Sequence, residues 1–207
     1  MKQFRGCSRL VYAPYTYAEG KVSFGAVKPL ATVKSISREI SSDSEEVWGD
    51  NKLDNTVFGG TSVTRTFGCT RIDPAVEAEL LGKATLKVGE NTLYGTPADG
   101  STRPYFAFGY ALHDGDVNKP CEIVWAFKGI VNSISKSANT IDRGTGSEGQ
   151  EINVTFHSPD VAWTKTSKNE LDIAMPVSEK TPVEIINKWF ASVISYDNAE
   201  TVLTASA

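Results

Sequence analysis

The sequence contains little cysteine and little histidine, and neither residue is clustered. The three cysteines, Cys7, Cys69 and Cys121, are far apart and form no Cys-x-x-Cys pair, and the only histidines are His113 and His157. An odd number of widely spaced cysteines predicts buried free thiols rather than a disulfide framework or a zinc site. We therefore expect a protein that is made in a reducing cytoplasm.

Long apolar runs and an excess of basic residues are also missing. The first residues, MKQFRG, are followed by no apolar stretch, so no signal peptide is expected, and no segment is long enough to span a membrane. The net charge is −4, which argues against a protein that binds nucleic acid by neutralising phosphates. It does not exclude a surface along which DNA passes without binding. The length of 207 residues fits a single domain spanning 1–207.

No sequence motif of known chemistry occurs in the context that its chemistry requires. Residues 144–149 match the pattern GxGxxG, but a strand pattern follows them where a dinucleotide site needs a helix. Asp114, Asp116 and Asn118 have the spacing of the first calcium-loop ligands, but the glycine and the glutamate of that loop are absent, which favours a hairpin turn. No serine lies in a GxSxG pattern. We predict no enzyme activity, no cofactor and no metal site.

What the sequence does contain is a series of short segments with alternating apolar and polar residues. Such alternation predicts strands, and no strand–helix–strand alternation accompanies it. The expected strands cover residues 7–12, 21–27, 30–40, 61–70, 104–112, 121–131 and 151–157. The predicted fold class is mainly β (α+β), a β-sandwich or an open barrel with a helix against it.

Two helices are expected. A short helix near 73–82 has Asp73 as its N-cap, Pro74 at its first helical position and Gly82 as a left-handed C-cap. A C-terminal amphipathic helix near 182–194 follows a capping box that begins at Thr181. Its apolar stripe consists of Val183, Ile186, Phe190 and Val193, widened by Ile185 and Trp189. The tail at about 198–207 is expected to fray.

A polar connection at about 41–60 joins two of the expected strands and concentrates the charge of the chain. From residue 39 to residue 54 it carries six acids and one base, a local charge of −5. The charged residues are Glu39, Asp43, Glu45, Glu46, Asp50, Lys52 and Asp54. A long acidic loop of this kind is either a solvated hairpin tip or an interaction element. A solvated loop is a poor place to tune a catalytic carboxylate, so an interface is favoured over catalysis.

The four tryptophans suggest two different roles. Trp125, Trp163 and Trp189 lie in or beside segments that are predicted to be buried, so core packing is expected for them. Trp48 lies inside the acidic loop and is a candidate interface anchor. An alternative function, a carbohydrate-binding or adhesion β-sandwich module, is motivated by the tryptophans and the strand-rich pattern.

The order of these features resembles a known family. The residues that carry the resemblance are the acidic loop SSDSEEVWGDNKLDN, then GGTSVTRTFGCTRIDPAVEAELLG, YFAFGYAL, EIVWAFKGIV, ANTIDRG and QEINVTFHS. Together they resemble the major tail proteins, or tail tube proteins, of long non-contractile-tailed bacteriophages. The resemblance covers about residues 5–160, and the C-terminal helix also fits it.

The resemblance implies a structural virion protein with a β-sandwich or barrel-like fold flanked by a helix. Such proteins form hexameric rings that stack into the tail tube, and genomic DNA passes through the lumen into the host without specific binding. The implied partners are other copies of the chain and further tail proteins such as the tape measure, tail terminator and distal tail proteins. The implied location is the virion, after synthesis in the host cytoplasm. A long loop reaches the neighbouring ring, and its candidate residues here are Asp43, Glu45, Glu46, Trp48, Asp50, Lys52 and Asp54.

Overall fold

The computed structural model describes residues 3–49, 52–97, 103–116, 118–137 and 149–204, and between residues 43 and 58 it describes the backbone only. Its elements are β1 (Gly6–Ala18), β2 (Lys21–Phe24), β3 (Lys28–Pro29), β4 (Val33–Gly49), β5 (Lys52–Cys69), α1 (Pro74–Leu81), β6 (Ala84–Val88), β7 (Asn91–Gly95), β8 (Tyr105–His113), β9 (Glu122–Lys136), β10 (Gln150–Phe156), β11 (Asp172–Pro176), α2 (Val183–Ala191) and α3 (Ala199–Thr204). The predicted mainly β (α+β) class is confirmed. Among the described residues, no helix is long and apolar enough to cross a membrane.

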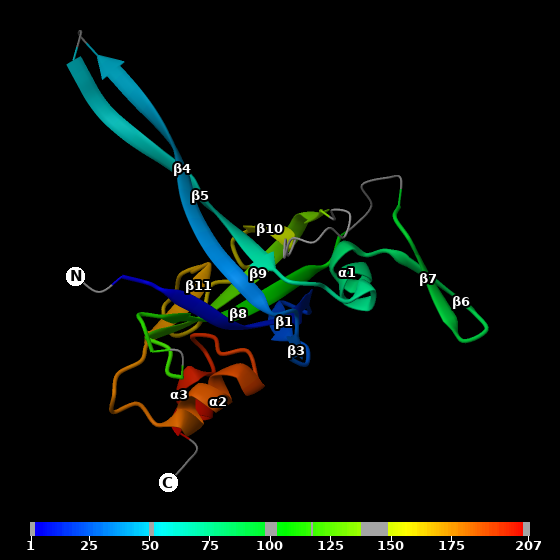
Figure 1. Ribbon diagram of the computed structural model, residues 1–207. Coiled ribbons are helices and arrows are strands. Elements are labelled where there is room, and N and C mark those ends of the chain that lie inside the picture. Colours follow the sequence, from blue (N-terminus) through cyan, green and yellow to red (C-terminus); the bar gives the residue numbers. More distant parts are fainter. Residues whose placement is uncertain (1–2, 50–51, 98–102, 117, 138–148, 205–207) are drawn as a thin grey trace, which may run out of the picture.

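One curled antiparallel sheet makes up most of the molecule (Figure 1). It has nine strands in the order β2-β1-β8-β9-β10-β5-β4, with β11 also paired to β9 and β3 to β1. The curl brings the base of β4, at one end of this order, close to β1, near the other end, because Leu30, just before β4, donates its N–H to the carbonyl of Leu10 in β1 at 3.0 Å. Of the two arrangements that the sequence left open, this single curled sheet corresponds to the open barrel. β6 and β7 form a separate two-stranded sheet.

The central strand β8 is buried on both faces of the sheet, which explains its continuous apolar sequence. Phe106 and Phe108 belong to one apolar cluster, together with α1, and Ala107 belongs to a second cluster, together with α2 and α3. A Cβ atom on Gly109 would lie 2.9 Å from the ring of Trp125, so glycine at this position leaves room for the indole to lie against β8. The sheet therefore has a hydrophobic core on each side.

Helix α1 forms where its caps predict it. The carboxylate of Asp73 accepts the N–H of Ala75 at 2.8 Å, and proline occupies the first turn. Gly82 has φ 63°, the left-handed conformation that ends a helix. Leu80 is fully buried against the sheet. The predicted helix near 73–82 is confirmed.

Helix α2 is confirmed in place but is shorter than the predicted span 182–194, and the predicted capping box is wrong. Pro182 is at the N-cap position, so the helix has no side-chain cap. The hydroxyl of Thr181 is already engaged, because it accepts the N–H of Ser178 at 3.0 Å. The Thr181 side chain therefore stabilises the turn before the helix and does not cap the helix.

The apolar stripe of α2 is rotated from the predicted one. Ile186 and Trp189 are buried, and so is Val193, which lies beyond the end of the helix. Val183 is 63% exposed, and Phe190 is only half-buried. The buried face therefore keeps Ile186 and Val193 of the predicted stripe and is shifted toward Trp189, which was predicted only to widen it.

The tail that was predicted to fray contains helix α3. Its start is held by Asn198, whose side-chain oxygen accepts the N–H of Ser195 at 2.8 Å and whose amide donates to the carbonyl of Val193 at 2.9 Å. Val202 and Leu203 pack against the same apolar cluster as α2. Local polar capping and apolar packing thus order this segment, while residues 205–207 lie outside the described residues.

Candidate functional site

The predicted acidic loop at about 41–60 is not a loop in the structure: it is the outer part of a long β-hairpin. β4 and β5 pair antiparallel from Val33 opposite Cys69 to Gly49 opposite Lys52. Their ladder hydrogen bonds join backbone groups, so they form whichever side chains the strands carry. Because nearly every position carries a polar residue, the sequence lacks the alternation of apolar and polar residues that predicts a strand.

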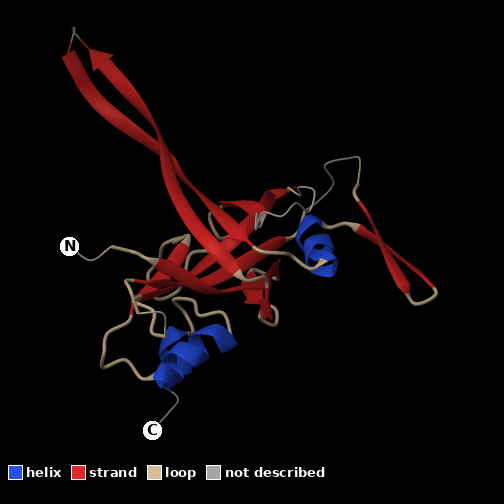
Figure 2. Cartoon of the chain, viewed as in Figure 1, coloured by secondary structure: helices blue, strands red, loops and turns tan. Residues whose placement is uncertain are grey.

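The outer part of this hairpin extends away from the main sheet (Figures 1 and 2). Strand β10 pairs with β5 only over Val63–Cys69. In the described chain, residues 52–62 of β5 therefore pair with β4 alone. From Ser42 to the end of β4 the projecting arm is about 25 Å long at the usual rise of a strand.

Most of the predicted site residues lie on this arm. Asp43, Glu45, Glu46 and Trp48 lie on β4, Lys52 and Asp54 lie on β5, and Asp50 is outside the described residues. In the ladder, Glu46 is opposite Thr56 and Trp48 is opposite Leu53. The register shifts once between Ser42 and Ser44 and again between Val47 and Trp48. Bulges of this kind increase the twist of a hairpin and change the direction of its strands.

The inner part of the hairpin is anchored in the core. Val63, Phe67 and Cys69 are buried on one face of β5, as the alternation predicts. Burial raises the pKa of the Cys69 thiol to about 11, so this thiol is protonated near neutral pH. All three cysteines are free, as predicted, with Cys69 buried and the other two half-buried.

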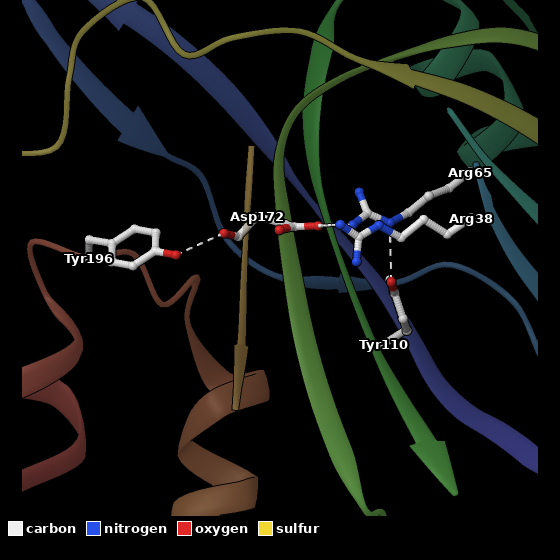
Figure 3. A network of polar contacts seen from close by, with 5 residues as sticks. All are labelled: Arg38, Arg65, Tyr110, Asp172 and Tyr196. Atoms are coloured by element: carbon white, nitrogen blue, oxygen red, sulfur yellow. Dashed lines mark hydrogen bonds and ion pairs between the residues drawn. The ribbon is translucent and has the colours of Figure 1, made fainter. Parts of the chain in front are cut away.

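The buried face of β5 also includes a charged residue that the sequence analysis did not single out, Arg65 (Figure 3). Its Nε donates to the Tyr110 hydroxyl at 3.1 Å, and its Nη2 pairs with the Asp172 carboxylate. The guanidinium lies 4.7 Å from the centre of the Phe156 ring. Burial raises the pKa of Tyr110 even though the guanidinium opposes this shift, so the phenol stays protonated.

Asp172 connects this buried arginine to two other parts of the chain (Figure 3). Arg38 of β4 also approaches its carboxylate, at 3.4 Å, and the hydroxyl of Tyr196 donates to its backbone carbonyl at 3.1 Å. The network therefore ties both strands of the hairpin base to β11 and to the segment between α2 and α3. The signal for Arg65 was present in the sequence, since it has the same parity as Val63 and the other buried positions of β5.

The remaining candidate groups behave as structural residues. Trp125, Trp163 and Trp189 are at most 3% exposed, which confirms the core role predicted for them. A carboxylate oxygen of Asp116, Oδ1, accepts the N–H of Asn118 at 2.8 Å. This hydrogen bond lies within the connection between β8 and β9, so the predicted turn is confirmed. The GxGxxG segment falls outside the described residues except for its last glycine.

Comparison with known proteins gives weak similarities. No protein-family model and no curated protein matches the chain. It is similar to a chain in the PVC sheath–tube complex of an extracellular contractile injection system (12% identity, TM-score 0.44, 82% of this chain and 89% of that chain covered). It is also similar to the tube-terminating cap of the anti-feeding prophage (9%, 0.45, 82% and 89%) and to the PVC sheath/tube terminator (13%, 0.40, 81% and 93%). Scores this low identify neither a family nor a function.

Proposed function

We propose that this chain is a structural subunit of a phage tail tube. Copies of the chain associate into hexameric rings, the rings stack, and the β4–β5 arm of each subunit contacts the next ring. The sequence resemblance is to non-contractile tails, whereas two of the three similar structures come from an extracellular contractile injection system. The proposal therefore concerns the tube and names no tail type.

The projecting arm is the observation that carries this proposal. An isolated two-stranded hairpin is marginally stable in water, and the outer part of this one has no further strand beside it in the described chain. A neighbouring subunit can supply the surface that the arm lacks. We assign the contact with the next ring to Asp43, Glu45, Glu46, Trp48, Asp50, Lys52 and Asp54, with Trp48 as the anchor and the acids facing basic partners.

A free sheet edge supports ring formation. β4 is the last strand in the sheet order, so in the described chain one of its edges has no strand partner. An exposed strand edge is a template for pairing with another chain. The net charge of −4 suits a lumen through which DNA passes without binding, in a particle that also contains terminator, tape-measure and distal tail proteins.

The alternative, a carbohydrate-binding module, loses its main support in the structure. Sugar binding by stacking needs exposed aromatic faces, and three of the four tryptophans are buried. We therefore propose a structural protein rather than an enzyme or a lectin.

Electron microscopy of the purified protein tests the proposal. Wild type should form rings and tubes, whereas a variant in which Asn-Gly joins Ser42 directly to Thr61 should form rings without long tubes. These two residues pair in the ladder, and Asn-Gly favours the two-residue turn that closes a hairpin. Long tubes from the shortened variant would overturn the stacking role. If wild type stays monomeric at all concentrations, the proposal that this chain forms a tube is wrong.

A matched pair of charge variants separates the arm from general surface charge. One variant changes Asp43, Glu45 and Glu46 to their amides, and the other changes three exposed acids elsewhere, Glu151, Glu179 and Glu184. Both lose the same charge, but only the first should shorten the tubes. Equal effects would mean that net charge, rather than contact by the arm, governs stacking.

A further inference from the structure

The second hairpin, β6–β7, stands apart from the main sheet beside α1 (Figure 2). Its register places Leu86 opposite Leu93 and Thr85 opposite Tyr94. Residues directly opposite each other in a ladder lie on the same face, and successive residues alternate between faces. The two leucines therefore share one face of the hairpin, and Thr85 and Tyr94 share the other.

One face of this hairpin looks toward its own chain. Thr85 and Tyr94 line a shallow cavity together with Ala75 and Ala78 of α1. Since this face is turned toward α1, the opposite face is turned away from it. The hairpin thus lies over α1 through its more polar side.

The opposite face is apolar and uncovered. Leu86 is 61% exposed, Val88 is 54% exposed and Leu93 is 53% exposed. Single exposed apolar residues are common on monomers. Three on one face of a projecting two-stranded sheet form an apolar patch, and such patches often mark interaction surfaces. Among the described residues of this subunit, none covers this face, which makes it a candidate contact surface.

The start of the hairpin is fixed to α1. The N–H of Lys83 donates to the carbonyl of Ala78 at 2.8 Å, which closes the C-terminus of α1. The ammonium of Lys83 pairs with Glu77 at 2.6 Å, and Glu77 also pairs with Lys136 of β9. These contacts fix the residue that leads into β6, which lowers the ordering cost of binding through the hairpin.

An apolar groove of about 950 Å³ is present elsewhere on the same subunit. Its apolar lining comes from β1, the β3–β4 region, α1 and α2, and includes Val11, Pro29, Ala31, Val33, Val76 and Phe190. At its side, Arg9 has φ 54° within a bulge of β1, and its guanidinium lies 5.6 Å from the centre of the Phe190 ring. A bulge redirects a side chain, and here it places a positive charge beside an apolar groove.

We propose that the apolar face of β6–β7 from one subunit packs into this groove of the next copy within a ring. The inference deepens the proposed function and rests on it, because it names the contact that builds the ring. The hairpin offers two leucines and a valine, and the groove offers apolar walls. The hairpin turn carries the exposed acid Glu90, opposite in charge to Arg9 of the groove. A contact between two different patches of identical subunits is head-to-tail, and such a contact builds a ring when the rotation between neighbouring subunits closes.

A native cysteine allows a direct test of this contact. Cys7 is half-buried and lines the groove. The full-length Leu86→Cys variant, with Cys121→Ser to remove the other partly exposed thiol, should form disulfide-linked multimers when it is oxidised with diamide. Mass spectrometry should identify the peptide that joins position 86 of one subunit to Cys7 of another. The same variant with Cys7→Ser is the control and should not form this ladder.

A second variant tests the contact without covalent cross-linking. Leu86→Ser with Leu93→Ser should raise the protein concentration needed for ring formation at least about tenfold, since each leucine loses its burial. The melting temperature of the monomer should stay unchanged because both side chains are exposed in it. The matched control replaces two exposed apolar residues elsewhere, Tyr17 and Val183, by serine and should assemble like wild type.

The outcomes separate this inference from the proposed function. Tubes of normal length from the double serine variant, with no link from position 86 to Cys7, would overturn the inference and leave the tube intact. Linked dimers from a protein that forms no rings or tubes would support the contact and overturn the tube. If position 86 links only to a different surface, the groove is the wrong receptor and the inference fails.

Discussion

The two projecting hairpins of this protein differ in how they are attached and in what they expose. β4–β5 continues two strands of the main sheet, and its base is fixed by Arg65 inside the core. β6–β7 belongs to no larger sheet and is fixed at its side, through α1 and Glu77. The outer part of β4–β5 is rich in acidic residues, whereas β6–β7 exposes an apolar face.

In the proposed tube, this difference predicts two kinds of contact. Exposed acidic side chains attract partners of opposite charge over a distance and specify orientation, but they contribute little net affinity. An apolar face contributes affinity through burial and has no long reach. An acidic arm suits contacts between rings that must find their register, and a short apolar hairpin suits permanent contacts within a ring. The following experiments test how firmly each hairpin is attached.

The largest effect is expected at the base of β4–β5. Asp172→Ala removes the carboxylate that pairs with the fully buried Arg65 and leaves that charge uncompensated. Removing one partner of a buried pair typically costs 3–5 kcal/mol, and we expect about 3 kcal/mol because Asp172 itself is partly exposed. Urea denaturation measures the change in the free energy of unfolding. Arg38→Met, whose side chain is 44% exposed, is the control and should cost less than about 1 kcal/mol. A cost for Asp172→Ala below that of the control would show that the network does not hold the hairpin base.

The sequence alone predicts the parts of the fold that depend on local chemistry. The caps of α1, at Asp73 and Gly82, are local signals, and the structure confirms them. Alternation in the segment that becomes β10 and the aromatic run of β8 also report burial directly. The cap signals work because the groups that hydrogen-bond to each capping residue lie within a few positions along the chain. The strand signals work because buried side chains recur at a fixed spacing.

The parts that escaped prediction depend on partners far away in the chain or outside it. Arg65 pairs with the carboxylate of Asp172, which lies 107 positions away in the sequence. The residues near Arg65 therefore do not predict this pair. The outer hairpin has no apolar parity in its sequence, and in the described chain its strands pair only with each other. In β6–β7, Leu86 and Val88 share one parity, but no apolar surface of the same subunit meets them in the described structure. Whether the site residues on the arm contact a second ring stays a prediction.

A smaller effect is expected at the anchor of β6–β7. Burial opposes ionisation of Glu77, but Lys136 and Lys83 outweigh it and hold the pKa of Glu77 below its usual value. A lowered pKa in the folded state adds stability above the ordinary carboxyl pKa of about 4.3, and this stability is lost as the pH falls through the folded value. Glu77→Gln should therefore cost about 1–2 kcal/mol at pH 7, and this cost should shrink as the pH falls through the lowered pKa of Glu77. A difference in unfolding free energy that does not change with pH would show that packing, not charge, anchors this hairpin.

A pair of glycine substitutions compares the backbones of the two hairpins. Gly82 leads from α1 into β6 with φ 63°, where a side chain costs on the order of 1 kcal/mol. Gly60 lies in β5, and a Cβ there would meet no atom within 4 Å. We expect Gly82→Ala to lower the free energy of unfolding by about 1 kcal/mol, and Gly60→Ala to leave it unchanged or raise it slightly. Thermal unfolding measures both, and equal destabilisation by the two substitutions would contradict the comparison.

The smallest effect on stability should come from the largest change in sequence. Joining Ser42 to Thr61 through Asn-Gly removes the outer arm but keeps the Ile40–Val63 pair and the Arg65 network. In the described chain the removed strands pair only with each other, so the loss of their ladder is offset by the entropy of residues that no longer need ordering. The free energy of unfolding should change by less than about 0.5 kcal/mol, within the range of surface substitutions.

Tryptophan fluorescence can follow unfolding of this shortened variant, because Trp48 is removed while the three buried tryptophans remain. The result also decides how the tube experiment is interpreted. A variant as stable as wild type that forms rings without long tubes would assign the arm to assembly and the core to folding. A loss of more than about 2 kcal/mol would mean that the arm packs on its own subunit. The contrast between an anchored base and a free outer end would then be wrong, and failure to form tubes would reflect damage to the subunit.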